Sequence, residues 1–234
     1  MTGDAGTTLG TVLGVWAHPD ETYLMAGTAL VAARQGSHVA CLTLTAGEAG
    51  ETADQERWPQ QDLAAIRAAE VKESLTILGI DDHTQLDLPD GGLPSVACAH
   101  AVGLIADVVE RVRPDTVLTF GPDGMTGHPD HVATGRWAVR AATTVMGDRC
   151  RVLAATKTPD WLDRFAAINE GIITSPPPNT PPDQLALHLR LLADDLDRKV
   201  RSLRAQASQT TGLIEALGED AYRDWLADEY WVEL

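Results

Sequence analysis

The sequence predicts an α/β fold in which helices cover both faces of a parallel sheet. Short apolar runs alternate with longer segments whose apolar residues recur at helical spacing, and this strand–helix order is repeated four times before residue 147. Turns rich in glycine, proline and acidic residues separate the segments. Such an alternating order is typical of right-handed crossovers that return the chain to one parallel sheet.

The N-terminal third contains two of the predicted strands. Residues 11–17 form a short apolar run, and residues 38–45 are apolar and β-branched. The helix predicted between them, residues 23–35, ends at Gly36. Residues 46–60 are polar and rich in glycine and glutamate, which indicates a long loop, and long loops in compact domains are often functional.

The middle of the chain continues the same order. Its apolar spacing and turn residues predict a helix at 63–78, a weak strand at 84–88, a helix at 95–112 with Ser95 as N-cap, a strand at 116–120 and a helix at 131–146.

The last third is less regular. Its pattern predicts a strand at 151–156, a helix at 161–168, a half-buried strand at 185–191 and a helix at 195–207. The proline-rich stretch at 175–182 is the one candidate boundary. We therefore expect a single domain over residues 1–234, in which the part from about residue 176 is an irregular extension packed on the rest.

The composition excludes several classes of function. The chain has 34 acidic residues against 18 lysines and arginines, a net charge of −16, so we expect neither nucleic-acid nor membrane binding. No long apolar stretch or basic leader is present, which favours a cytoplasmic protein. Cys41, Cys98 and Cys150 are expected to be free, buried thiols. The expected partner is a small-molecule substrate, and the sequence is compatible with a homo-oligomer.

Two clusters of histidine and carboxylate residues follow predicted strands. They contain His18, Asp20, Glu21, His128, Asp130 and His131. Crossovers of one hand place the carboxyl ends of parallel strands at the same edge of the sheet, so the two clusters are expected to meet there.

The residue types in these clusters predict a zinc site. A catalytic zinc takes three protein ligands and one water molecule, whose pKa falls to about 7. The remaining donors would supply a carboxylate as general base and an imidazole as general acid or oxyanion partner. Asp130 is a candidate to orient a histidine. The residues alone do not decide which donor has which role.

Arg67 lies near the middle of the apolar face of the helix at 63–78, beside Glu70. One interpretation is an Arg67–Glu70 pair at helical spacing, with the arginine stem reaching solvent. The other is an arginine that reaches a substrate pocket.

The motifs resemble those of the LmbE/PIG-L family of zinc-dependent N-acetylglucosaminyl deacetylases. The segment 17–21 (AHPDE) resembles the family's AHPDD(E) motif, and 128–131 (HPDH) resembles its HPDH motif. Residues 44–48, the pair Arg67 and Glu70, and 199–209 look like further family segments. The resemblance implies a Rossmann-like sandwich of the LmbE type.

The resemblance also implies a role for each donor. His18 and His131 would bind Zn²⁺, one ion per chain, with Fe²⁺ as the alternative metal. Asp20 would be the general base. His128, oriented by Asp130, would protonate the leaving amine or stabilise the oxyanion, and Arg67 would contact the substrate.

This chain departs from the family at two positions. The family usually has two consecutive aspartates where this chain has Asp20 and Glu21. Read without a gap, Glu21 replaces the ligand aspartate; read with a gap, one aspartate is missing and the family's glutamate remains. Glu21 is the nearest candidate third ligand in either case. At Gln206, many members have a histidine, so the role of that histidine is in doubt here.

The implied activity is metal-dependent amide hydrolysis that deacetylates an N-acetyl amino sugar or a related N-acyl substrate. An amidase of the mycothiol S-conjugate type and a deacylase that tailors a natural product are the alternative enzymes. A catalytically impaired protein that binds metal and sugar is the alternative from another class. A nucleotide-binding oxidoreductase is disfavoured, because no G-x-G-x-x-G follows the first strand.

Overall fold

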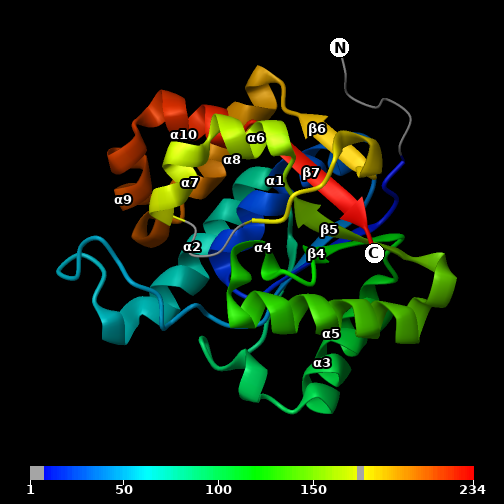
Figure 1. The fold of residues 1–234 in the computed structure, drawn as a ribbon. Coiled ribbons are helices and arrows are strands. Elements are labelled where there is room, and N and C mark those ends of the chain that lie inside the picture. Colours follow the sequence, from blue (N-terminus) through cyan, green and yellow to red (C-terminus); the bar gives the residue numbers. More distant parts are fainter. Residues whose placement is uncertain (1–7, 173–176) are drawn as a thin grey trace.

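One seven-stranded mixed sheet forms the centre of the molecule in the computed structural model, which describes residues 8–172 and 177–234 (Figure 1). The strand order is β3-β2-β1-β4-β5-β7-β6. The strands are β1 (Val12–Trp16), β2 (Val39–Thr43), β3 (Asp82–Gln85), β4 (Thr116–Phe120), β5 (Arg151–Thr156), β6 (Leu187–Arg190) and β7 (Asp228–Glu233).

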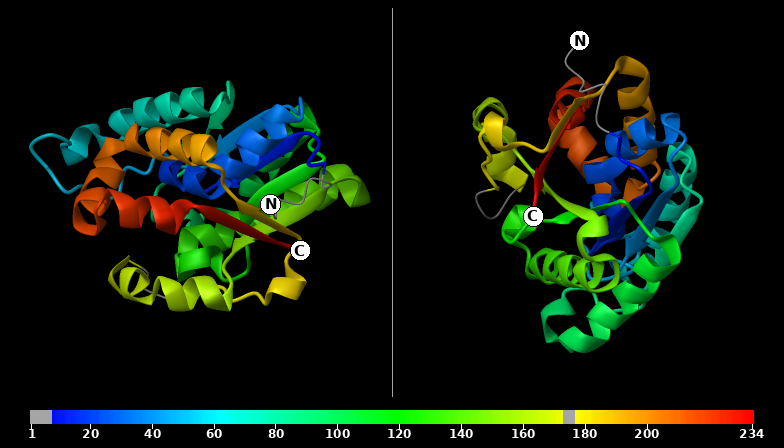
Figure 2. Two further views of the ribbon diagram at one scale, coloured as in Figure 1. Left: turned by 90° about the horizontal axis from the view of Figure 1, so that it is seen from above. Right: turned by 90° about the vertical axis from the view of Figure 1, so that its right-hand side faces the viewer.

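Helices cover both faces of this sheet. They are α1 (Thr22–Arg34), α2 (Leu63–Leu78), α3 (Cys98–Val112), α4 (Gly124–Gly127), α5 (Pro129–Met146), α6 (Pro159–Arg164), α7 (Ala166–Ile172), α8 (Ala193–Arg204), α9 (Ala207–Leu217) and α10 (Glu219–Leu226). α1, α2 and α8 pack together on one face, and α3 and α5 pack on the other (Figure 2). The predicted α/β class with helices on both faces is therefore confirmed.

The parallel part of the sheet matches the prediction, except that the strand expected at 84–88 lies at 82–85 and is only partly buried. β1 to β5 pair in parallel, and the predicted strand at 116–120 has the bounds of β4. Every residue of β1, β2 and β4 is buried, which explains why these strands appear in the sequence as continuous apolar runs.

The C-terminal segment is more regular than the sequence indicates. β7 returns antiparallel beside β5, and β6 pairs antiparallel with β7, so the sheet is mixed rather than purely parallel. β7 is the red strand beside β5 in Figure 1. Part of the proline-rich stretch at 175–182 lies outside the described residues.

Two smaller expectations are corrected. α3 begins at Cys98, and Ser95 belongs to a separate 3-10 turn because the extended backbone of Val96 interrupts the helix. Cys98 is exposed and Cys150 is only partly buried, although all three cysteines are free and Cys41 is buried as expected. Among the described residues, no helix combines the length and the apolar character needed to cross a membrane.

A buried lysine follows β5. Lys157 is 7% exposed, and its Nζ lies 4.1 Å from the centre of the Trp161 ring. Burial, together with the nearby cation of Lys199, lowers the pKa of Lys157 to about 7. Lys199 itself is paired with Glu229 at 2.7 Å.

This lysine should make stability depend on pH. The folded protein releases the proton of Lys157 near pH 7, whereas the unfolded chain keeps it until about pH 10.5, so the unfolded state binds more protons between these values. The free energy of unfolding therefore gains up to about 1.4 kcal/mol per pH unit from this group above pH 7. We expect the free energy of unfolding of the wild type to rise by about 2 kcal/mol relative to that of Lys157→Met between pH 7 and pH 9, measured by urea unfolding. Lys72→Met, at an exposed position of α2, is the control; an equal pH trend in both variants would contradict the assignment.

Candidate functional site

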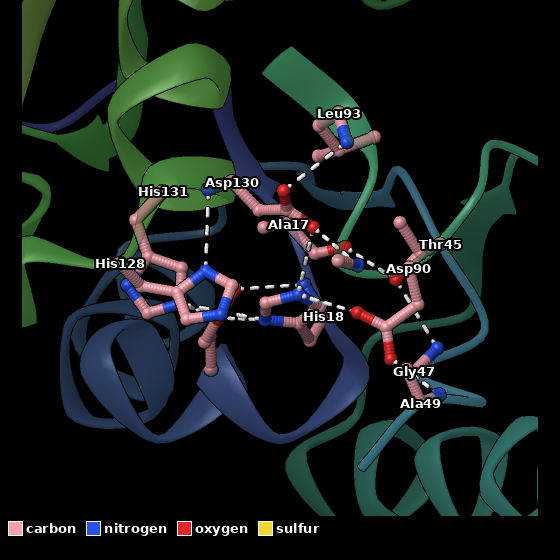
Figure 3. Close-up of polar contacts among 12 residues, drawn as sticks. Ala17, His18, Thr45, Gly47, Ala49, Asp90, Leu93, His128, Asp130 and His131 are labelled. Atoms are coloured by element: carbon pink, nitrogen blue, oxygen red, sulfur yellow. Dashed lines mark hydrogen bonds and ion pairs between the residues drawn. The ribbon is translucent and has the colours of Figure 1, made fainter. Parts of the chain in front are cut away.

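The two sequence clusters meet at the carboxyl edge of the central strands. His18 follows β1 and stands at the start of a short 3-10 turn, Pro19–Glu21, while His128 and His131 lie at the start of α5 after β4. Figure 3 shows the three imidazole rings gathered there. His18 and His131 are 113 residues apart in sequence, yet their ring centres are 5.2 Å apart.

The carboxylate of Glu21 lies between two imidazoles. Its Oε1 is 2.6 Å from Nδ1 of His18 and 2.5 Å from Nε2 of His131, and those two nitrogens are 3.3 Å apart. The other oxygen, Oε2, accepts a 2.8 Å hydrogen bond from the backbone N–H of His18. Glu21 is buried, so its charge is balanced only by these neighbours.

The loop between β4 and α5 fixes the ring of His131. The Nδ1–H donates a 2.9 Å hydrogen bond to the carbonyl of Gly124, and the ring stacks on Phe120 with centroids 4.3 Å apart. The neighbouring Met125 has a positive φ of 65°, a conformation that L-residues rarely adopt. With Nδ1 held by the Gly124 carbonyl, Nε2 is the nitrogen that faces Glu21 and His18, and its N–H donates to Glu21.

Two more carboxylates surround the outer nitrogen of His18. Its Nε2 lies 2.9 Å from Oδ1 of Asp90 and 3.4 Å from Oδ2 of Asp130. The carboxylate of Asp130 is fully buried and also accepts hydrogen bonds from the backbone N–H groups of Gly91 and Leu93 (Figure 3). These acids favour a proton on Nε2, and Nδ1 is the nitrogen of His18 that faces Glu21 and His131.

The charges of this cluster shift its pKa values strongly. Burial disfavours the charged form of His18, but Glu21, Asp130 and Asp90 outweigh it and raise the pKa of His18 to about 12. Burial also opposes ionisation of Glu21, yet His131 and His18 lower its pKa far below the usual range. The pKa of His131 is raised, because the charge of Glu21 outweighs its burial.

His128 differs from the other two histidines. Burial and the cations of His131 and His18 lower its pKa, so its neutral form is favoured. Its Nδ1 accepts a 3.2 Å hydrogen bond from the backbone N–H of Asp130, which places its proton on Nε2. A neutral Nε2–H that lines the cavity is suited to donate a hydrogen bond to an oxyanion.

Arg67 is buried at 3% exposure and does not pair with Glu70. Its guanidinium forms an ion pair with Asp20 and donates a 2.6 Å hydrogen bond to the carbonyl of Gly47. The carboxylate of Glu70 instead accepts hydrogen bonds from the backbone and side chain of Ser208 at the start of α9. The interpretation as a helical-spacing pair is therefore wrong, and Arg67 lines the cavity.

Asp90 is the site residue that the sequence reasoning missed. It lies in the turn after β3, at the same edge of the sheet as the two clusters. The backbone N–H of Ala49 donates to its carboxylate at 2.8 Å, and its own N–H donates to Glu48 at 3.0 Å. Ligand sites lie beyond the carboxyl ends of parallel strands, so the turn after the third predicted strand was also a candidate position.

Gln206 has a packing role in this structure. It is 1% exposed, and its side-chain amide donates to the hydroxyls of Thr22 and Ser74 at 2.9 and 3.1 Å. It ties α8 and α9 to α1 and α2 and is absent from the lining of the cavity.

Six predicted site residues line one cavity of about 550 Å³: His18, Asp20, Glu21, Arg67, His128 and His131. Asp130 lies behind them. The expectation that its side chain orients His128 is corrected, because its carboxylate faces His18 and only its backbone N–H contacts His128.

The chemistry of the inner donors fits a divalent metal ion. Two imidazole nitrogens and one carboxylate oxygen are a common ligand set for Zn²⁺ and for Fe²⁺. Ligands at about 2.0–2.1 Å in a tetrahedron are about 3.3 Å apart, which matches the 3.3 Å between the nitrogens of His18 and His131. Glu21 is closer to both, at hydrogen-bonding distance, and would have to move outward by less than about 1 Å.

Fold and site together define a Rossmann-like domain with a candidate metal centre at the carboxyl edge of its sheet. A family model described as GlcNAc-PI de-N-acetylase (PIG-L) matches residues 13–142, more than half of the chain. The chain therefore belongs to the PIG-L family.

Comparisons with individual proteins agree with this assignment. A 1D-myo-inositol 2-acetamido-2-deoxy-alpha-D-glucopyranoside deacetylase from Catenulispora acidiphila is 34% identical over 55% of this chain and 46% of its own length. The chain thus spans about half the length of the curated relatives that it matches.

Solved structures share the fold along nearly the whole chain. N,N'-diacetylchitobiose deacetylase from Pyrococcus horikoshii has a TM-score of 0.63 and 21% identity, and covers 97% of this chain and 84% of its own. The 4-carboxy-2-hydroxymuconate hydratase from Pseudomonas putida has a TM-score of 0.67 and 19% identity, covering 97% of this chain and 96% of its own. At these identities the likeness establishes the fold alone.

Gly47 is expected to be essential for the position of Arg67. Its φ is +71°, and a Cβ there would lie 2.3 Å from the guanidinium carbon of Arg67. Gly47→Ala should therefore move Arg67 in addition to straining the backbone by about 1–2 kcal/mol. Gly36→Ala is the matched control, because Gly36 has a φ of +79° and nothing within 4 Å of the added carbon. We expect Gly47→Ala to lower the free energy of unfolding by at least about 1 kcal/mol more than Gly36→Ala; equal losses in urea unfolding would contradict the contact.

Proposed function

We propose that this protein is a metal-dependent amidohydrolase that removes an acyl group from the nitrogen of an amino sugar or a closely related amine. The observation that carries the proposal is the convergence of His18, Glu21 and His131 on one point of a cavity wall that also holds Asp20 and His128. The relative from Catenulispora acidiphila, a deacetylase of an inositol-linked glucosaminide, supports the same reaction class.

His18, Glu21 and His131 would hold the metal ion, one per chain. When bound there, Zn²⁺ would supply Lewis acidity toward the amide carbonyl and lower the pKa of water. Fe²⁺ is the alternative, because a ligand set of two histidines and one carboxylate also suits ferrous iron. Asp90 and Asp130 would keep the proton of His18 on Nε2, away from the metal.

The other side chains would handle the protons and charge of the reaction. Asp20 would accept the proton of the attacking water and then transfer it to the amine nitrogen as the C–N bond breaks. Its ion pair with Arg67 holds it at the cavity wall. The Nε2–H of His128 would donate a hydrogen bond to the carbonyl oxygen as that oxygen gains negative charge. Of the two roles left open for His128, an Nε2–H at the cavity favours oxyanion stabilisation.

The direct test is acetate release from N-acetylglucosaminides, including the inositol glucosaminide of the relatives, by protein stripped of metal and then reloaded with Zn²⁺ or Fe²⁺. We expect activity only after reloading. Metal-independent hydrolysis would overturn the mechanism. Metal binding without hydrolysis across a broad panel of amides would instead favour a catalytically impaired binding protein.

The role of Asp20 can be separated from metal binding. Asp20→Asn should lower kcat by about 10²- to 10⁴-fold, since it removes the general base, while the metal content measured by elemental analysis stays the same. Asp87→Asn, at an exposed position before the Asp90 turn, is the control. Unchanged kcat in Asp20→Asn would exclude Asp20 as the base.

Glu21 should determine metal affinity. Glu21→Gln keeps the shape of the side chain but removes the buried negative charge between the two imidazoles. We expect Zn²⁺ affinity to fall by more than about 100-fold, measured by competition with a chromophoric chelator. Glu51→Gln, in the exposed loop, should retain wild-type affinity; equal affinity in both variants would remove Glu21 from the ligand set.

A further inference from the structure

A second cavity lies between α5 and the segment that leads into α3. α3 and α5 pack against each other (Figure 1), and the cavity between them has a volume of about 620 Å³. It shares no lining residue with the catalytic cavity, so it is a separate site. We call it the α3–α5 groove. Its apolar lining residues are Pro94, Val96, Pro129, Val132 and Ala133.

Two arginines without a carboxylate partner line the same groove. Arg136 and Arg140 are exposed and lie one turn apart on α5. Within the described part of the chain, Arg136 has no ion-pair or hydrogen-bond partner, and Arg140 contacts only the sulfur of Cys98, at 3.8 Å. The lining contains neither aspartate nor glutamate, although the whole chain has a net charge of −16. Two unpaired cations in an acidic protein therefore make this groove attractive to an anion.

A buried indole provides a further donor. Trp137 lines the groove and is 6% exposed. Its indole N–H has no acceptor among the described residues, and it is not one of the unpaired polar atoms that are sealed from solvent. Polar groups at buried positions normally have a hydrogen-bond partner. An acceptor atom in the groove would supply one for this N–H.

The N-terminus of α3 adds backbone donors. α3 has 15 residues and begins at Cys98, which also lines the groove. Its N-cap is Ala97, so no side chain caps its first N–H groups, and its first turn contains no acidic residue. The first N–H groups of a helix carry a partial positive charge that favours anions. Guanidinium, indole and backbone donors thus adjoin one groove that is otherwise apolar.

We propose that the α3–α5 groove binds a small organic anion, which has an apolar body and a carboxylate or phosphate group. The charged group matches the donors of Arg136, Arg140 and Trp137, and the apolar body matches Val96 and Val132. Guanidinium groups bind carboxylate and phosphate oxygens with the same paired geometry, so both anions share this chemistry. The volume of about 620 Å³ lies within the range of about 300–1,000 Å³ that is typical of small-molecule sites.

The test is isothermal titration calorimetry of the metal-loaded protein with 4-phenylbutanoate, phenyl phosphate, the uncharged 4-phenylbutan-1-ol and acetate. Hydrogen bonds to a charged group are stronger than those to a neutral one, so we expect at least one of the two aromatic anions to bind about tenfold or more tightly than the alcohol. The same anion should bind more tightly than acetate, which has almost no apolar surface to bury. The tighter of the two aromatic anions identifies the charged group. Binding of the alcohol as tight as that of both aromatic anions would overturn the inference.

Side-chain variants show whether this anion lies in the groove. Arg136→Gln and Arg140→Gln should each weaken its binding by about tenfold or more, and Trp137→Phe by about threefold or more, since each removes a donor. Arg113→Gln, at an exposed position outside the groove, is the control. An anion bound instead at the catalytic metal would have the same affinity in all four variants, and that result would overturn the inference.

Cys98 provides a readout at the groove itself. Its thiol is exposed, whereas Cys41 is buried and Cys150 is partly buried. The saturating anion should slow the alkylation of Cys98 by N-ethylmaleimide several-fold, and Cys98→Ser should remove the protected reaction. An unchanged rate would overturn the inference. A lower molar mass of Arg136→Gln in sedimentation, without anion binding to the wild type, would show that a second copy covers the groove and would also overturn it.

Discussion

The contact on which the site depends is the buried carboxylate of Glu21 between the imidazoles of His18 and His131. One oxygen faces both rings, and the other accepts the backbone N–H that closes the turn after β1. A buried charge is stable only with close partners, so this contact holds the β1 turn against the start of α5. The parallel pairing of β1 with β4 makes the contact available, because it brings both strand ends to one edge.

The same contact bears on how Asp20 and Glu21 align with the family motif. The structure places Glu21 against both histidines and Asp20 against Arg67, so the two acids face different neighbours. This arrangement favours the alignment without a gap, in which Glu21 takes the place of the ligand aspartate. From the short Pro19–Glu21 turn after β1, the carboxylate of Glu21 reaches both rings.

The sequence predicts those features that depend on local pattern. β1, β2 and β4 are continuous apolar runs because both faces of each strand are covered, and the clusters around His18 and His131 could be placed together because strand ends share an edge. The antiparallel return of β7 and the partners of Arg67 could not be predicted, since they depend on contacts between distant segments. Arg67 shows this best. Helical spacing predicts Glu70 as its partner, but Glu70 accepts hydrogen bonds from Ser208 of a distant helix, and Arg67 pairs with Asp20 instead.

The side chains that line the cavity come from two parts of the chain. The candidate metal ligands, Asp20 and His128 lie within the region that the family model matches, whereas Leu213, Tyr222 and Trp225 lie beyond it. The shared fold alone does not fix the reaction, because the Pseudomonas putida protein with the same fold is named as a hydratase. We therefore infer that the reaction depends on the side chains at the sheet edge. Helices α9 and α10 complete the cavity with side chains that take no part in the contact made by Glu21 with His18 and His131.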